Sequence, residues 1–127
     1  MNPIDELIQS ARAAREKAQA IYSNFKVGAA LRTKSVNIFT GSNIESSSYG
    51  LTICAERVAI FKAVSEGETD ITDIAIIITS RENMIYVKGI GNIIGKTIRL
   101  ISKEKSIRHT IIRANIKISC KYNSRGI

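Results

Sequence analysis

The sequence predicts an α/β domain with three layers, α/β/α, in which helices cover both faces of a mixed sheet. Segments with helical spacing of apolar residues alternate with short runs of β-branched residues along the chain. One run, residues 74–78, is apolar throughout, as in a strand covered on both faces. A chain of 127 residues is long enough for one such core, so we expect residues 1–127 to form a single domain.

The first element is expected to be a helix over residues 3–20. Asn2 caps free backbone N–H groups, and Pro3 fits the first helical position. Apolar residues then recur at helical spacing as far as Ile21.

Residues 27–31 and 36–40 are rich in β-formers around a polar turn, which predicts a hairpin, and a Ser- and Asn-rich loop follows over residues 41–50. A second helix is expected from residue 54 to residue 67, with Gly67 as its terminator and three apolar residues on its buried face: Val58, Phe61 and Val64.

The last third of the chain has a weaker pattern. Residues 112–118 alternate between apolar and polar, which predicts a half-buried strand. A helix over residues 93–101 would join this strand to residues 74–78 by a right-handed crossover.

The net charge of +8 is unevenly distributed. Residues 1–80 carry 8 Lys and Arg against 9 Asp and Glu, whereas residues 81–127 carry 11 against 2. A basic segment of this kind attracts phosphate groups, or is a solvated surface. Its excess of Ile, Lys and Asn is also what an AT-rich gene encodes when read out of frame. Two cysteines and no membrane-length apolar stretch lead us to expect a cytoplasmic protein without a membrane partner.

Cys54 and Glu56 lie two positions apart at the start of the second expected helix. A hydrolytic zinc deaminase needs a metal ligand beside a carboxylate that is not a ligand, so that the carboxylate can move protons for a metal-bound water. A single cysteine at a helix start is more commonly a small buried apolar residue, and a first-turn glutamate commonly stabilises its helix.

Five fragments occur in an order that resembles the small homotetrameric cytidine deaminases: residues 22–30, 41–45, 48–50, 54–57 and 61–67. That zinc-dependent family deaminates cytidine and deoxycytidine in pyrimidine salvage. The resemblance covers residues 1–80, while residues 81–127 diverge.

The resemblance implies a role for each matched residue. Cys54 would be a zinc ligand, Glu56 the catalytic proton shuttle, and Arg57 a supporting cation that offsets thiolate charge. Asn43 and Glu45 would bind the sugar hydroxyls. The full set of positions implied to bind the nucleoside is Phe25, Asn43, Ile44, Glu45 and Ala55.

The second half of the zinc motif, Pro-Cys-x-x-Cys, is missing from the expected place. That register falls on residues 87–91, where the pair of ligand positions holds either Lys88 and Gly91 or Val87 and Ile90, none of which binds zinc. His109 and Cys120 together with Cys54 would supply three donors. His109, however, lies in a basic stretch without a nearby carboxylate, and Cys120 follows the expected strand.

Three functions are therefore open. The first is hydrolytic deamination of cytidine and deoxycytidine by a homo-oligomeric zinc enzyme, a tetramer by resemblance. The second is a nucleoside-binding relative, or a frameshifted product, that has lost two zinc ligands and the chemistry. The third is a basic nucleic-acid-binding protein that uses residues 88–125, where aromatic residues for base stacking are scarce.

Overall fold

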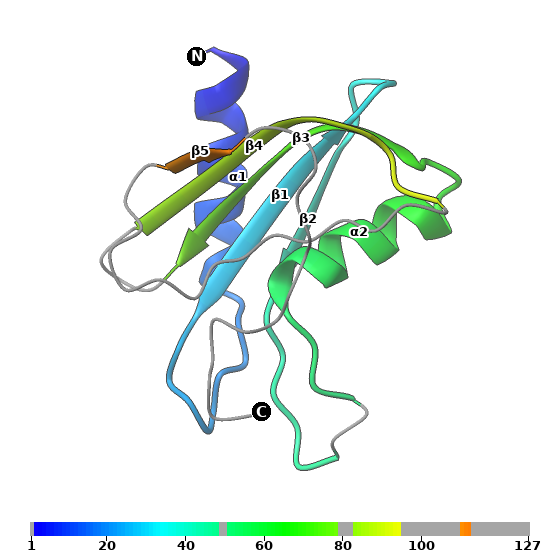
Figure 1. Ribbon diagram of the computed structural model, residues 1–127. Helices are drawn as coiled ribbons and strands as arrows, with labels where there is room; N and C mark the ends of the chain where they lie inside the picture. Colours follow the sequence, from blue (N-terminus) through cyan, green and yellow to red (C-terminus); the bar gives the residue numbers. More distant parts are fainter. Residues whose placement is uncertain (1, 49–50, 79–82, 95–109, 113–127) are drawn as a thin grey trace.

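The structure is a computed structural model that describes residues 2–48, 51–78, 83–94 and 110–112. Within these residues a helix lies on each face of the sheet (Figure 1), which confirms the predicted three layers. The strand order is β2-β1-β3-β4-β5, with antiparallel pairs except for the parallel pair β4–β5. The elements are α1 (Pro3–Arg15), β1 (Val27–Thr33), β2 (Ile38–Ser42), α2 (Ala55–Ser65), β3 (Asp70–Ile78), β4 (Asn83–Asn92) and β5 (Thr110–Ile112).

An apolar core forms on each face of the sheet because successive residues of a strand point to opposite faces. In β3, Ile74, Ile76 and Ile78 belong to the core beneath α2. Ala75 and Ile77 belong to the core beneath α1. The prediction that residues 74–78 are covered on both faces is therefore confirmed.

Two glycines allow the helices to approach the sheet closely. A Cβ atom at Gly28 would lie 2.0 Å from the carbonyl oxygen of Ala11 in α1. A Cβ atom at Gly41 would lie 2.4 Å from the carbonyl oxygen of Ala55 in α2. Both distances are far below van der Waals contact, so each position accepts only glycine without a shift of its helix.

Helix α1 begins as predicted but ends earlier. The Asn2 Oδ1 atom accepts a hydrogen bond from the Asp5 N–H at 2.8 Å, which confirms the cap. The helix stops at Arg15 instead of residue 20. The next residues leave the helix because Gln19 forms backbone hydrogen bonds with the segment that follows β2.

The hairpin is confirmed with shifted ends. Val36 was expected in the second strand, but it lies in the turn with φ of 69° and is 73% exposed. Strand β2 starts at Ile38 and includes Gly41, which was expected in the loop.

The predicted buried face of α2 is wrong for Phe61, which is 56% exposed. Val58 and Val64 are partly buried, and Val64 packs against the core. The alanines of α2 are buried against the sheet: Ala55, Ala59 and Ala63. Such small side chains are required because the helix backbone packs directly against Gly41.

Strand β4 was not predicted. It pairs antiparallel with β3, and Val87 then pairs in parallel with Ile112 of β5. Residues 74–78 in β3 therefore lie between β1 and β4, and the strand near Ile112 lies beyond β4. Of the helix expected over residues 93–101 and the strand over 112–118, only residues 93–94 and 112 are described, and residues 93–94 are not helical.

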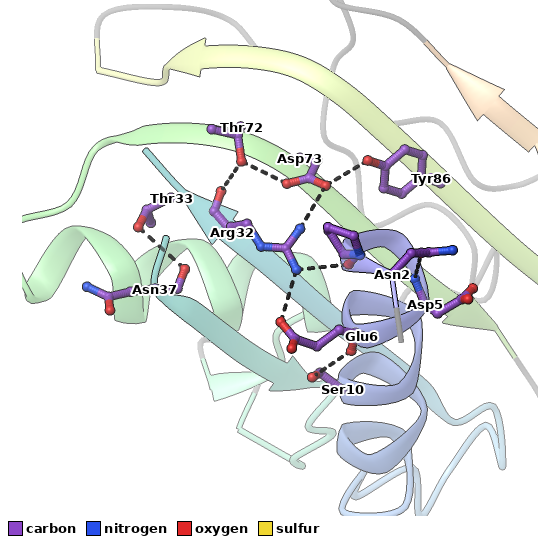
Figure 2. A network of polar contacts seen from close by, with 11 residues as sticks. Asn2, Asp5, Glu6, Ser10, Arg32, Thr33, Asn37, Thr72, Asp73 and Tyr86 are labelled. Carbon is purple, nitrogen blue, oxygen red and sulfur yellow. Dashed lines mark hydrogen bonds and ion pairs between the residues drawn. The ribbon is translucent and has the colours of Figure 1, made fainter. Parts of the chain in front are cut away.

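A polar network joins α1, β1, β3 and β4 at the end of the sheet away from Val27 (Figure 2). Arg32 Nη1 lies 3.4 Å from Asp73 Oδ2, and Arg32 Nη2 donates to the Pro3 carbonyl at 2.9 Å. The Tyr86 hydroxyl donates to Asp73 Oδ2 at 2.7 Å. Burial, and then the hydrogen bond to Asp73 and its charge, raise the pKa of Tyr86 to about 12.

Neither helix in the described part of the chain has the length and apolar character needed to cross a membrane.

Candidate functional site

Three backbone segments, around Gln19, Ile44 and Ile53, meet beside the start of α2. Ile44 and Ile53 exchange backbone hydrogen bonds of 3.0 and 2.9 Å in an antiparallel bridge. Gln19 lies on the other side of this segment, and its N–H donates to the Asn43 carbonyl at 3.0 Å. In antiparallel pairing the residues that flank a bridge are also opposite one another, so Asn43 lies across from Cys54.

Asn43 holds the segment that leads into β1. Its side chain is buried, with the residue 4% exposed. Asn43 Oδ1 accepts from the Val27 N–H at 2.9 Å, and Nδ2 donates to the Phe25 carbonyl at 2.7 Å. An amide has a second N–H and a second lone pair, so these two bonds leave capacity for a further polar partner.

Glu45 holds the adjacent turn. Its Oε1 atom accepts from the backbone N–H groups of Tyr22 and Ser23 at 2.9 and 3.0 Å, and Oε2 accepts from the Ser23 hydroxyl. Burial alone would raise the pKa of the Glu45 carboxyl, but the hydrogen bonds from Ser23 and Tyr22 outweigh it, and the pKa is lowered. Glu45 is therefore an anion at neutral pH.

The remaining implied substrate positions surround these two residues. Phe25 is partly buried and packs against the core that contains Ala55. Ala55 is fully buried as the first residue of α2. Ile44 is 39% exposed, so its backbone forms the bridge while its side chain reaches solvent.

Cys54 is the N-cap residue of α2 and is 3% exposed. Glu56 lies in the first turn and is fully buried. Arg57 is exposed. Cys54 and Glu56 are thus both buried at the start of α2, next to the segment that carries Asn43 and Glu45, and Arg57 lies at the surface.

These residues do not fit a zinc site in the described part of the chain. No group of three or more His, Cys, Asp or Glu there could hold a metal ion. The Cys54 sulfur is not a free thiol in this structure. The register in which the missing cysteine pair was sought, residues 87–91, is strand and not a helix start, and Val87 belongs to the core. His109 and Cys120 lie outside the described residues.

The basic segment offers little for base stacking where it is described. Tyr86 is 5% exposed and hydrogen-bonded to Asp73, so its ring is not available to a nucleobase. Tyr122 lies outside the described residues.

Residues 1–85 match the family model described as "Cytidine and deoxycytidylate deaminase zinc-binding region". The chain belongs to this family. The family member from Halalkalibacterium halodurans, a cytidine deaminase, is 55% identical over 71 residues, which is 56% of this chain and 54% of that protein. The chain spans about half the length of the curated relatives it matches.

Solved structures of cytidine deaminases have the same fold as this chain. The enzyme from Mycobacterium tuberculosis matches with a TM-score of 0.57 and 33% identity over 61% of this chain and 63% of that one. The enzyme from Burkholderia pseudomallei matches with a TM-score of 0.54 and 38% identity over 84% of this chain and 72% of that one. The resemblance inferred from the ordered fragments is confirmed.

The sequence did not single out Ser23, Gln19 or Ile53, although all three build the site. Ser23 lies inside one of the family-like fragments, residues 22–30, and this position could have indicated a role in the site. Gln19 and Ile53 act through backbone groups, which leave no trace in side-chain pattern.

Proposed function

We propose that the chain binds cytidine or deoxycytidine at the site formed by residues 43–45, Phe25 and the start of α2. The observation that carries this proposal is the burial of the Asn43 amide and the Glu45 carboxylate on the segment bridged to the residues that lead into α2, where Cys54 and Glu56 are also buried. An amide and a carboxylate with remaining capacity suit two neighbouring hydroxyls of a ribose, and a partly buried aromatic residue suits the base.

The reaction we propose for such a site is hydrolytic deamination. We propose Glu56 for proton transfer, because a buried carboxylate beside the nucleobase can accept and return a proton. Zinc would supply the activated water. Since the described residues do not fit zinc, we expect less than one zinc per chain and little turnover. By resemblance we also propose one domain, a homo-oligomer, a cytoplasmic location and a role in pyrimidine salvage.

The test is cytidine binding by calorimetry on the full chain, with bound zinc measured by mass spectrometry and ammonia release measured in parallel. We expect cytidine to bind and adenosine not to bind. The Glu56→Gln variant separates binding from chemistry because it keeps the shape of the side chain and removes its base.

The absence of cytidine binding would refute the proposal. Stoichiometric, tightly held zinc together with ammonia release that Glu56→Gln abolishes would instead identify an active deaminase. Strong RNA binding with a steep salt dependence would favour the nucleic-acid alternative.

A further inference from the structure

We infer that Ser23 is a positioning residue that orients the Glu45 carboxylate toward the sugar of a bound nucleoside and ties it to the Phe25 backbone. This inference rests on the proposed function of the site.

The Ser23 hydroxyl connects two implied substrate-binding residues. Its one O–H is donated to Glu45 Oε2, and its oxygen accepts the Phe25 N–H at 3.1 Å. The Phe25 carbonyl is in turn held by Asn43 at 2.7 Å. Phe25 is therefore held on both sides of its backbone, by Ser23 at its N–H and by Asn43 at its carbonyl.

The hydrogen bonds also set the direction of the carboxylate. Glu45 receives three of them from Tyr22 and Ser23, two at Oε1 and one at Oε2. A carboxylate has about four acceptor positions, so about one remains for a ligand hydroxyl. Only the bond from the Ser23 side chain occupies Oε2 among these three, so this bond decides how the second oxygen is presented.

Backbone geometry does not replace the hydroxyl. Without it, the two backbone N–H groups would still hold Oε1, but the carboxylate could rotate about that anchor. The Phe25 N–H, which is part-buried, would also lose its acceptor. Loss of the hydroxyl should therefore weaken binding of the sugar more than binding of the base.

The experiment measures dissociation constants for cytidine and for 2′,3′-dideoxycytidine, which lacks the 2′- and 3′-hydroxyls and keeps the 5′-hydroxyl. The dissociation constant for 2′,3′-dideoxycytidine divided by that for cytidine reports the contribution of the 2′- and 3′-hydroxyls alone. In Ser23→Ala we expect this ratio to fall about tenfold, which is about 1.4 kcal/mol, because the bond that orients the carboxylate is lost and part of the sugar contact is kept by reorientation.

Ser23→Thr keeps the hydroxyl and should restore the ratio. Ser65→Ala is the matched control, since Ser65 donates to the Lys62 carbonyl at 2.9 Å on an exposed part of α2. If Ser23→Ala does not fold, Ser23→Cys replaces it, with a weak donor and an intermediate ratio expected.

If Ser23→Ala changes only fold stability, the binding of both ligands weakens equally and the ratio stays unchanged. An unchanged ratio would overturn the inference. A wild-type ratio near one would also overturn it, while cytidine binding itself would still support the proposed function. Failure of the wild-type chain to bind either ligand would refute the proposed function and this inference together.

Discussion

Replacement of Gly41 by alanine should displace α2 and with it the start of the candidate site. The new Cβ atom would lie 2.4 Å from the Ala55 carbonyl oxygen and 2.6 Å from the Ala59 N–H nitrogen. Both atoms belong to the backbone, so no side chain can rotate away. Ordinary contact begins at 3.4 Å, and the helix must therefore retreat by about 1 Å.

Overpacking of this kind costs about 1–3 kcal/mol of unfolding free energy. At roughly 4 °C for each kcal/mol in a domain of this size, the melting temperature should fall by about 4–12 °C. Because Cys54 and Glu56 move with the helix, cytidine binding should weaken as well. Thermal unfolding followed by circular dichroism, together with calorimetric titration of cytidine, measures both effects.

Gly67→Ala is the control for this substitution. Gly67 follows α2 with φ of +86°, and a Cβ atom there would meet nothing within 4 Å. Alanine at this position suffers backbone strain of about 1–2 kcal/mol without a clash. We expect this variant to lose stability but to keep its affinity for cytidine. Unchanged melting temperature and affinity in Gly41→Ala would refute the close contact between α2 and β2.

Three further predictions concern polar groups. Asn43→Ala should lower the unfolding free energy by about 2–4 kcal/mol, because it leaves two backbone groups without a side-chain partner; a urea-unfolding shift below about 1 kcal/mol would contradict this. Because the pKa of Glu45 is lower in the folded chain than in the unfolded chain, its carboxylate stabilises the fold above the unfolded-state pKa, and this stability should be lost as the pH falls through the folded-state pKa. Glu45→Gln should show a weaker dependence of stability on acid pH. Parallel acid profiles for the two proteins would contradict this prediction. Tyr86→Phe should cost about 1.5–3 kcal/mol at neutral pH by removing the bond to Asp73. Because the pKa of Tyr86 is raised to about 12, its stabilisation is complete below pH about 10 and should be lost toward pH 12, a loss that the phenylalanine variant would not show.

Much of the fold could be predicted because its signals are local. The cap at Asn2 and the continuous apolar run of residues 74–78 each reflect nearby residues, and both are confirmed. The end of α1 could not be predicted, since Gln19 leaves the helix to pair with a segment more than twenty positions away.

The buried face of α2 shows why pattern alone was insufficient. The apolar spacing favours the large side chains, Phe61 among them, but the close approach at Gly41 selects the alanine face. This contact depends on α2 and β2 together. It cannot be predicted from the sequence of either element alone.

The candidate site divides in the same way. The family-like fragments predicted which residues belong to the site, and in the structure Asn43 lies on the segment that is bridged to the residues leading into α2, where Cys54 and Glu56 are buried. The role of Ser23 could not be predicted, because it depends on the direction of one hydroxyl bond.

The bridges among Gln19, Ile44 and Ile53 use main-chain atoms only. Mutation can therefore alter side chains along these three segments while the alignment between them persists. With such an architecture, substrate-binding residues and catalytic residues can be lost independently during evolution. A protein that has lost its metal ligands can therefore keep a backbone arranged to bind the substrate.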